Sequence, residues 1–209
     1  MPADRLHLVR HGEVHNPDHV LYGRLPNFGL SVEGRRMARQ AADHVHAWER
    51  PISSLVCSPL QRAQESARPF TDLFGIEPLI DERVIEPTNV FEGKVMKRAV
   101  MNPLNWRHLR KPAVPSWGEP YEQIIARMDA AMTDAWTRVD GGDVVIVSHQ
   151  LPIWVTHLWV AGEPARHDPR KRRCGLSSVT SFEQRDGHWV EVGYAEPAST
   201  VGSIDVGAV

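Results

Sequence analysis

Apolar and polar positions along the 209-residue chain alternate between short hydrophobic runs and amphipathic stretches. The apolar and β-branched runs at 5–9, 53–58 and 143–149 predict buried strands. The last of these has four consecutive apolar residues, as is typical of a central strand that is covered on both faces. Apolar positions recur at spacings of three and four over 30–50 and 121–139, which predicts two amphipathic helices.

Cap and turn residues extend this pattern into a fold. Ser31 can cap the helix over 30–50, and Ser58-Pro59 opens a further helix. A helix candidate follows at 151–161, and a hairpin is expected to turn at Asp186-Gly187. Strands alternating with helices, followed by a late hairpin, predict an α/β fold: a three-layer α/β/α sandwich with a mainly parallel central sheet.

A single domain over residues 1–196 accounts for the pattern, and 197–209 is expected to be a loosely ordered tail. One segment, 94–118, differs in composition because it has six Lys and Arg, no Asp or Glu, and two tryptophans. Two interpretations stay open for it. It is either a basic surface helix and loop or a lid insertion that recognises the substrate beyond its phosphate.

Charge and cysteine content limit the partners and the compartment. There are 24 Lys and Arg against 26 Asp and Glu, a balance that predicts binding to neither nucleic acid nor a membrane surface. The two cysteines are too few for a disulfide framework and favour a reducing compartment. No signal-peptide pattern or membrane-spanning apolar run is present, so the expected location is the cytoplasm. The oligomeric state stays open, a homodimer included.

Three predicted strands end in side chains that suit phosphate. The first delivers Arg10 and His11, the second leads to Arg62, and the buried strand over 143–149 delivers His149. Ligands of open α/β sheets bind at the carboxyl ends of the strands, so these four side chains are expected to converge. A lone His or Arg at such a position is more often an ordinary polar residue. The joint occurrence at three strand ends favours a site.

The residue types in this set match phosphoryl chemistry. Guanidinium groups bind phosphate oxygens bidentately and keep their charge. A neutral imidazole is a competent nucleophile, and nearby arginines would lower its pKa and keep it neutral. A second imidazole can stabilise charge on the transferring group. Gly12, directly after His11, lets the backbone turn without a Cβ in the way.

The motifs LVRHGE (8–13), CSPLQRAQES (57–66) and VIVSHQ (145–150) resemble those of the histidine phosphatase superfamily, which includes the cofactor-dependent phosphoglycerate mutases. The resemblance extends from residue 6 to about 195. It implies that His11 is the phosphate-accepting nucleophile. Arg10, Arg62 and His149 would complete the phosphate pocket, with Gln150 beside them.

The resemblance also implies an acid, and here the sequence departs from the pattern. Glu86 in DERVIEPTNVFEG fills the role, although the usual intervening glycine is missing and the segment is one residue shorter. The alternative for Glu86 is a surface ion pair with Arg83. Asn16 falls one place earlier than the phosphate-contacting asparagine of the mutases, and its alternative is a loop turn before Pro17.

Neither a metal nor another cofactor is expected, because arginines and imidazoles already neutralise the phosphate. The His44–His46 and His15–His19 pairs do not predict a metal site, since the first is two apart on a helix and the second spans Pro17. Cys57 is expected to be a small core residue. The basic run 170–173 is either a solvated patch or a contact for an anionic substrate.

These observations predict a phosphatase that hydrolyses a small phosphomonoester through a phosphohistidine on His11. The partner would be a small phosphorylated metabolite, and Arg107 and Arg110 in the basic segment would contact its distal part. A cofactor-dependent phosphoglycerate mutase is the first alternative. A non-catalytic phosphate-binding module on the same fold is the second, although joint retention of the four strand-end side chains argues against it.

Overall fold

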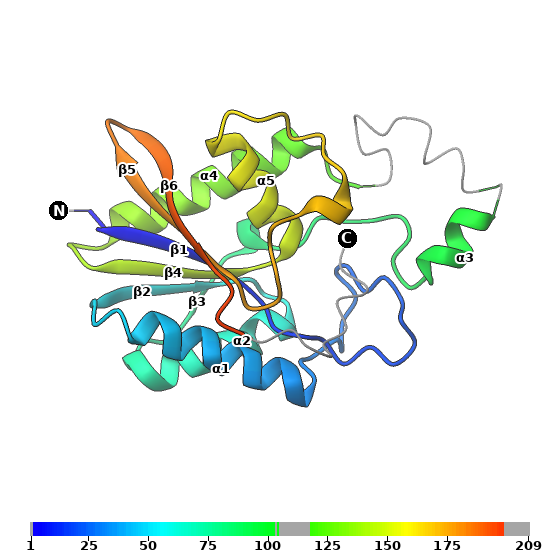
Figure 1. Cartoon of the computed structure of the whole chain (residues 1–209), viewed down its shortest axis with the longest axis horizontal. Coiled ribbons are helices and arrows are strands. Elements are labelled where there is room, and N and C mark those ends of the chain that lie inside the picture. The colour runs from blue at the N-terminus through cyan, green and yellow to red at the C-terminus, as the bar shows by residue number, and fades with distance from the viewer. Residues whose placement is uncertain (1, 103, 105–117, 199–209) are drawn as a thin grey trace.

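A six-stranded sheet forms the centre of the computed structural model, which describes residues 2–102, 104 and 118–198. The strand order is β3-β2-β4-β1-β5-β6 (Figure 1). Strands β1, β2, β3 and β4 run parallel, whereas β5 and β6 are antiparallel additions at one edge. The strands are β1 (Arg5–Arg10), β2 (Ile52–Cys57), β3 (Leu79–Ile80), β4 (Asp143–Ser148), β5 (Val179–Arg185) and β6 (His188–Ala195).

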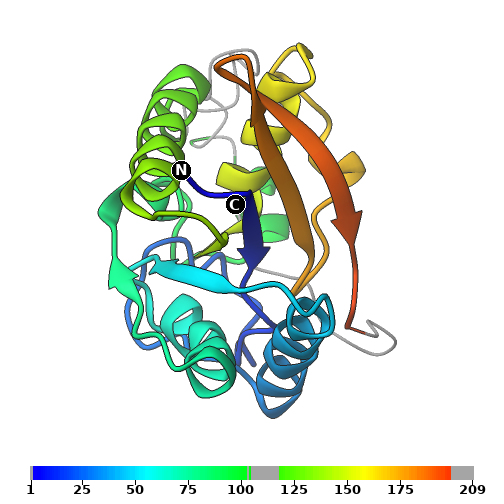
Figure 2. The same cartoon turned by 90° about the vertical axis from the view of Figure 1, so that its left-hand side faces the viewer.

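Helices cover both faces of this sheet. Helices α1 (Val32–His46) and α2 (Gln61–Phe74) lie together on one face, and α4 (Tyr121–Arg138) and α5 (Gln150–Val160) lie on the other (Figures 1 and 2). The short α3 (Met96–Met101) lies apart, and two 3₁₀ turns occur at η1 (Glu82–Val84) and η3 (Pro169–Lys171). The predicted three-layer α/β/α sandwich with a mainly parallel sheet is confirmed.

Local signals set most of these boundaries. The Ser31 hydroxyl accepts a hydrogen bond from the Gly34 amide at 2.9 Å and caps α1 as predicted. The hairpin turns at Asp186-Gly187, which both have positive φ, as a two-residue turn requires. Helix α2 begins at Gln61, two residues later than Ser58-Pro59 suggested. Strand β3 was not expected, because two residues carry no periodicity.

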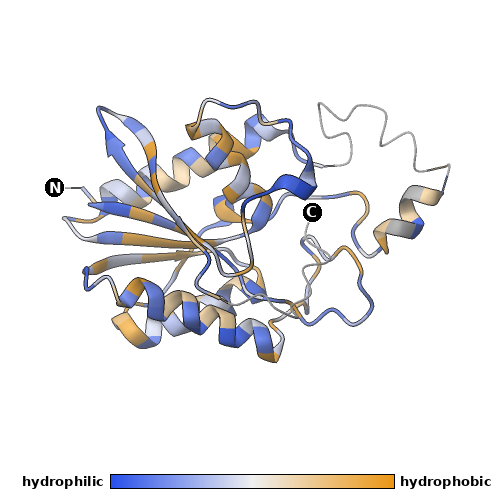
Figure 3. Ribbon diagram, viewed as in Figure 1, coloured by the Kyte–Doolittle hydropathy of each residue, from blue (hydrophilic) through white to orange (hydrophobic). Residues whose placement is uncertain are grey.

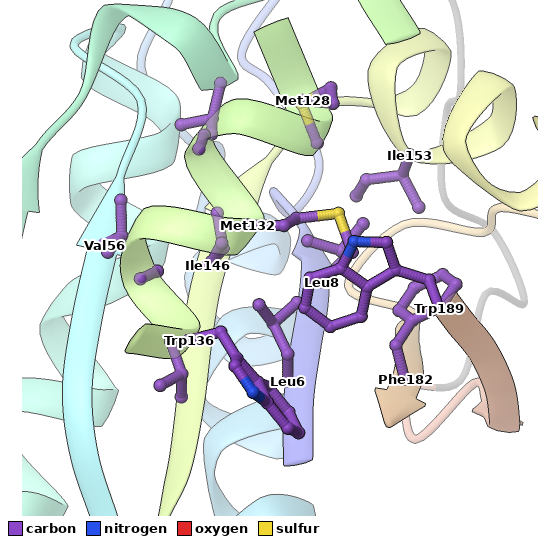
Figure 4. Packing of buried hydrophobic residues seen from close by; sticks show 14 of the residues in the cluster. Leu6, Leu8, Val56, Met128, Met132, Trp136, Ile146, Ile153, Phe182 and Trp189 are labelled. Carbon is purple, nitrogen blue, oxygen red and sulfur yellow. The ribbon is translucent and has the colours of Figure 1, made fainter. Parts of the chain in front are cut away.

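Buried apolar side chains form a core on each side of the sheet, and alternate residues of β4 contribute to opposite cores. Val144 and Ile146 pack with α4, whereas Val145 and Val147 pack with α1 and α2. Figure 4 shows the first of these clusters, in which Met132 of α4 approaches Leu8 of β1. This double covering explains the uninterrupted apolar run of β4 and the apolar residues along the sheet in Figure 3.

Buried polar side chains join the strands at the opposite end from the predicted site. Asp143 accepts two hydrogen bonds from the Arg50 guanidinium, at 2.6 and 2.7 Å. His7 lies between Asp143, 3.2 Å from Nε2, and the Ser181 hydroxyl, 2.8 Å from Nδ1. These contacts satisfy the polar groups that interrupt the apolar pattern of β1.

Two further predictions concern the C-terminal tail and the segment 94–118. Ala198, beyond the predicted domain boundary, is buried with Met37 and Leu176. The remainder of the predicted tail and residues 105–117 of the predicted lid lie outside the described residues, so both assignments stay predictions. Within the described ranges, no helix is both long and apolar enough to cross a membrane.

A close backbone contact fixes the loop that follows β1 against the first turn of α1. A Cβ on Gly34 would lie 1.9 Å from the Glu13 carbonyl oxygen, and one on Gly12 would lie 2.3 Å from the Gly34 carbonyl oxygen. The Ser31 amide also donates to the Glu13 carbonyl at 2.9 Å. The sequence analysis expected Gly12 to allow a sharp turn. In the structure, the absence of a Cβ at Gly12 allows this close backbone approach.

Replacing Gly34 by Ala is therefore expected to destabilise the fold by at least ~2 kcal/mol, because the neighbouring atoms belong to backbone and cannot rotate away. The substitution would otherwise gain up to about 1 kcal/mol of helix propensity. Urea unfolding measures the change. Arg39→Ala, on the exposed face of α1, is the control and should shift stability by less than ~0.5 kcal/mol. A stabilised Gly34→Ala protein would contradict the packing argument.

Candidate active site

The predicted catalytic side chains meet at the edge where the parallel strands end. Arg10 is the last residue of β1, His11 follows it, and His149 directly follows β4. Arg62 lies in the first turn of α2, and Glu86 comes two residues after η1. All five residues are buried, with no more than 1% of their surface exposed. The convergence expected from the strand ends is present in the structure.

The His11 ring is held in one orientation and one tautomer. Its Nδ1 lies 2.8 Å from the Gly12 carbonyl oxygen, which can only accept, so Nδ1 carries the proton. The Nε2 lone pair is left to face Arg62, whose Nε donates to it at 3.3 Å. Burial lowers the pKa of His11 well below its usual value, and Arg62 and then Arg10 lower it further. The sequence analysis named only the arginines, but burial is the larger cause.

Backbone carbonyls orient the two buried arginines. Arg62 Nη2 donates to the Gly23 carbonyl at 2.7 Å, and its guanidinium lies 4.7 Å from the centre of the Tyr22 ring. Arg10 Nη1 donates to the Cys174 carbonyl at 2.6 Å. Contacts with neutral carbonyls orient the guanidinium groups without cancelling their charge. The surroundings of His11 are therefore suited to an anion.

His149 lies beside His11, and Glu86 lies next to His149. The His149 ring centre lies 5.1 Å from that of His11, and its Nε2 lies 2.7 Å from the Ser58 hydroxyl. Its Nδ1 is 3.6 Å from Glu86 Oε2. Burial lowers the pKa of His149 and raises the pKa of Glu86, the latter against the opposing effect of nearby arginines. Both groups therefore favour their neutral forms.

One buried atom of each of these residues, His149 Nδ1 and Glu86 Oε1, lacks a hydrogen-bond partner within the described part of the chain. Unpaired buried polar atoms are costly, and they are typical of sites whose hydrogen bonds are completed by a bound group. The alternative in which Glu86 pairs with Arg83 at the surface does not match this geometry. Arg83 pairs instead with Asp81 and Asp134.

The remaining predicted site residues have other contacts. The Asn16 side chain bonds the backbone of Val20, donating to the carbonyl at 2.8 Å and accepting from the amide at 3.2 Å. Gln150 Oε1 accepts from Arg172 Nη1 at 3.2 Å. Their predicted contacts with phosphate stay predictions. Arg107 and Arg110 lie outside the described residues.

Several contacts in the site were not anticipated. The Gly12 amide donates to the Ser66 hydroxyl at 3.1 Å, and Ser66 lies one turn after Arg62 in the second motif. Because Ser66 follows Arg62 by four residues in a helix, the sequence could have indicated that both side chains face the site. Tyr22 and Cys174 come from irregular segments, where no periodicity indicates which residues approach the strand ends. Cys57 is a buried core residue, as predicted, and burial raises the pKa of its thiol to about 12.

No cluster of three or more His, Cys, Asp or Glu side chains able to hold a metal ion occurs in residues 2–102, 104 and 118–198. The charges that act most strongly on Glu86 are those of arginines, which favour an anionic ligand. The expectation that activity needs no metal stays a prediction.

Comparisons with known proteins identify the family of this chain. The sequence profile of the histidine phosphatase superfamily (branch 1) matches residues 6–197. An uncharacterised Mycobacterium tuberculosis protein is 45% identical over 203 residues, which cover 95% of this chain and 100% of that protein. A probable phosphoglycerate mutase from an Enterobacter strain is 25% identical over 213 residues, covering 98% of this chain and 97% of the mutase.

Solved structures share the fold at lower identity. Phosphoserine phosphatase from Entamoeba histolytica, solved with 3-phosphoglyceric acid, has a TM-score of 0.75 and 20% identity, covering 91% of this chain and 96% of its own. The mycobacterial glucosyl-3-phosphoglycerate phosphatase has a TM-score of 0.73 and 23% identity, covering 90% and 96%. These structures show the shared fold, and the profile match over residues 6–197 shows that this chain belongs to the histidine phosphatase superfamily (branch 1).

Proposed function

We propose that this protein is a phosphatase that hydrolyses a small phosphomonoester through a phosphohistidine intermediate on His11. The observation that carries the proposal is the buried, neutral His11 ring, whose Nε2 lone pair faces Arg62. A neutral imidazole beside two buried guanidinium groups is a nucleophile placed where an anionic phosphoryl group would bind.

In the first step, His11 Nε2 attacks phosphorus while the bond from phosphorus to the ester oxygen breaks. Arg10 and Arg62 bind the non-bridging oxygens and offset their charge. Glu86, whose pKa burial raises, gives its proton to the departing oxygen, so the alcohol leaves neutral. His149 donates a hydrogen bond to the transferring group.

In the second step, water attacks the phosphohistidine and the phosphorus–nitrogen bond breaks. The Glu86 carboxylate formed in the first step takes the proton from water. Inorganic phosphate leaves, and His11 returns to its neutral form. The same residue thus acts first as acid and then as base.

Small phosphomonoesters also occur with two proteins of similar structure. A structural neighbour was solved with 3-phosphoglyceric acid, and another is a glucosyl-3-phosphoglycerate phosphatase. We therefore propose a small phosphorylated metabolite as the substrate and the cytoplasm as the location. No metal is proposed, because the arginines already offset the charge of the phosphoryl group.

The intermediate should be detectable directly. Brief incubation with phosphorus-labelled substrate, in the presence of excess chelator, should label the protein with a phosphoramidate that survives alkali and is lost in acid. A His11→Ala protein should take up no label, because Nε2 is the accepting atom. Undiminished labelling of His11→Ala would refute the assignment of the nucleophile. Loss of wild-type labelling on chelation, with recovery on adding a divalent ion, would refute the metal-free mechanism.

The pH dependence of activity should reflect the protonation of His11 and the ionisation of Glu86. Activity should fall on the acid side as His11 protonates, at a pH below the usual imidazole value, because its pKa is lowered. It should fall on the alkaline side as Glu86 ionises, at a pH above the usual carboxyl range, because its pKa is raised. Glu86→Gln cannot ionise, so the ratio of its profile to that of the wild type should isolate the alkaline limb and cancel substrate ionisation.

Glu86→Gln should also discriminate between leaving groups. Alkyl phosphates need a proton on the departing oxygen and should slow by roughly 100- to 10,000-fold. p-Nitrophenyl phosphate, whose leaving group needs little protonation, serves as the matched control and should change little. Equal slowing of both substrates would indicate that Glu86 positions the substrate or that another acid, such as Glu13, donates the proton.

Phosphoglycerate mutase activity remains the second candidate because a probable mutase aligns over nearly the whole chain. Two features favour hydrolysis. The acid segment 81–93 is shorter than in mutases, and Asn16 binds Val20 within its own loop. With 3-phosphoglycerate and a bisphosphoglycerate primer, phosphate release should outpace formation of 2-phosphoglycerate. Interconversion much faster than phosphate release would establish the mutase instead.

A further inference from the structure

The backbone around Glu86 has no strand or α-helix to hold it, because Glu86 lies two residues beyond the short turn η1. A backbone carbonyl that is kept from water needs a hydrogen-bond partner from elsewhere. Three carbonyls of the segment 83–86 accept from side chains of other parts of the fold: Arg83 from Arg127, Val84 from Ser148, and Glu86 from Arg24. Side chains therefore hold this segment in place of a ladder of backbone hydrogen bonds.

The three donors come from separate parts of the chain. Ser148 is the last residue of β4, Arg127 lies in α4, and Arg24 lies in the loop between β1 and α1. Hydrogen bonds from charged donors are stronger than those from a neutral hydroxyl, so the two arginines hold the segment most strongly. The position of Glu86 then depends on what fixes Arg24 and Arg127.

One carboxylate, that of Glu119, contacts both arginines. Its Oε1 accepts from Arg127 Nε at 2.8 Å and its Oε2 accepts from Arg127 Nη2 at 3.0 Å, which makes a bidentate pair. The same Oε2 lies 3.6 Å from Arg24 Nη2. The side chains of Glu119 and Arg127 are only 14% and 15% exposed, so water and salt screen this pair less than a surface ion pair. Glu119 thus links the two arginines that hold the segment 83–86.

The backbone fixes Glu119 beside that segment. Glu119 follows Gly118, which forms an antiparallel bridge with Asn89. A Cβ on Gly118 would lie 2.5 Å from the Thr88 carbonyl oxygen, so the close approach of the two chains requires glycine. Thr88 and Asn89 come two and three residues after Glu86. The chain that carries Glu119 is therefore attached to the chain that carries Glu86.

The charge of Glu119 has a second effect on Glu86. Burial raises the pKa of Glu86, and nearby arginines oppose the increase. In order of effect they are Arg62, Arg172, Arg10 and Arg127. His149 also faces Glu86, at 3.6 Å, and burial favours its neutral form by lowering its pKa. Because the Glu119 carboxylate offsets the charge of Arg127, it favours the protonated form of Glu86.

We propose that Glu119 is a positioning residue for the proton donor of the reaction. Through Arg24 and Arg127 it fixes the backbone that carries Glu86, and by offsetting the charge of Arg127 it keeps Glu86 protonated. The inference rests on the proposed function, since it takes Glu86 to be the proton donor.

Glu119→Gln tests the positioning, because it removes the charge and keeps a hydrogen-bond acceptor. At the pH of maximal activity the variant should hydrolyse alkyl phosphates roughly 10- to 100-fold more slowly than the wild type, since a displaced acid donates its proton less readily. p-Nitrophenyl phosphate should change little. Asp134→Asn is the matched control, because it removes a carboxylate that pairs with Arg83 at the surface, and it should leave both rates unchanged.

The alkaline limb of the pH profile tests the charge. Glu119→Gln leaves Arg127 without its counter-ion, which favours ionised Glu86, so the limb should move to lower pH. Arg127→Gln removes the positive charge and keeps Glu119, so the limb should move to higher pH. The double variant removes both charges and should return the limb toward its wild-type position. A loss of structure alone would not shift the two single variants in opposite directions.

The outcomes separate failure of this inference from failure of the proposed function. If Glu86→Gln slows alkyl and p-nitrophenyl phosphates equally, Glu86 is not the proton donor and both proposals fail. If Glu86→Gln discriminates between them, the inference about Glu119 fails when Glu119→Gln slows both equally or when the two single variants do not shift the limb in opposite directions. Thermal unfolding checks each variant, and if one single variant does not fold, the direction of the shift in the other decides.

Discussion

Exclusion of water from the carboxyl end of the sheet is the constraint on which the site depends. In water a glutamate has a pKa of about 4.3 and a histidine about 6.5, so between these values both are charged. Burial disfavours both charged forms, raising the pKa of Glu86 and lowering that of His11. In the mechanism that we propose, a neutral imidazole attacks phosphorus and a protonated carboxyl releases the alcohol. One environment thus prepares both groups.

The same burial disfavours the charged arginines and lowers the pKa of Arg62. The fold offsets this with backbone carbonyls of Gly23 and Cys174, which come from irregular segments packed over the strand ends. These contacts orient the two guanidinium groups, which we propose bind a phosphoryl group. The backbone contact between Gly12 and Gly34 keeps the His11 loop against α1, so the ring stays beside Arg62.

Sequence alone predicted the parts of the site that follow from regular structure. Arg10 and His149 stand at the ends of apolar runs, and parallel strands bring such ends together. It could not predict contacts made by irregular segments, because no period relates a loop residue to the strand it reaches. Tyr22 beneath Arg62 is one example, and the two-residue β3 is another.

The site residues on strands and helices differ from those on irregular segments in how firmly the fold holds them. The residues that we propose to bind phosphate lie at strand ends and in the first turn of α2, where backbone hydrogen bonds and two apolar cores fix each position. The segment that carries Glu86, which we propose to face the leaving group, follows a 3₁₀ turn and belongs to no strand or helix. Loops of this kind vary more readily than the elements they join. The proposed chemistry can therefore stay constant among related proteins while the alcohol that they accept changes.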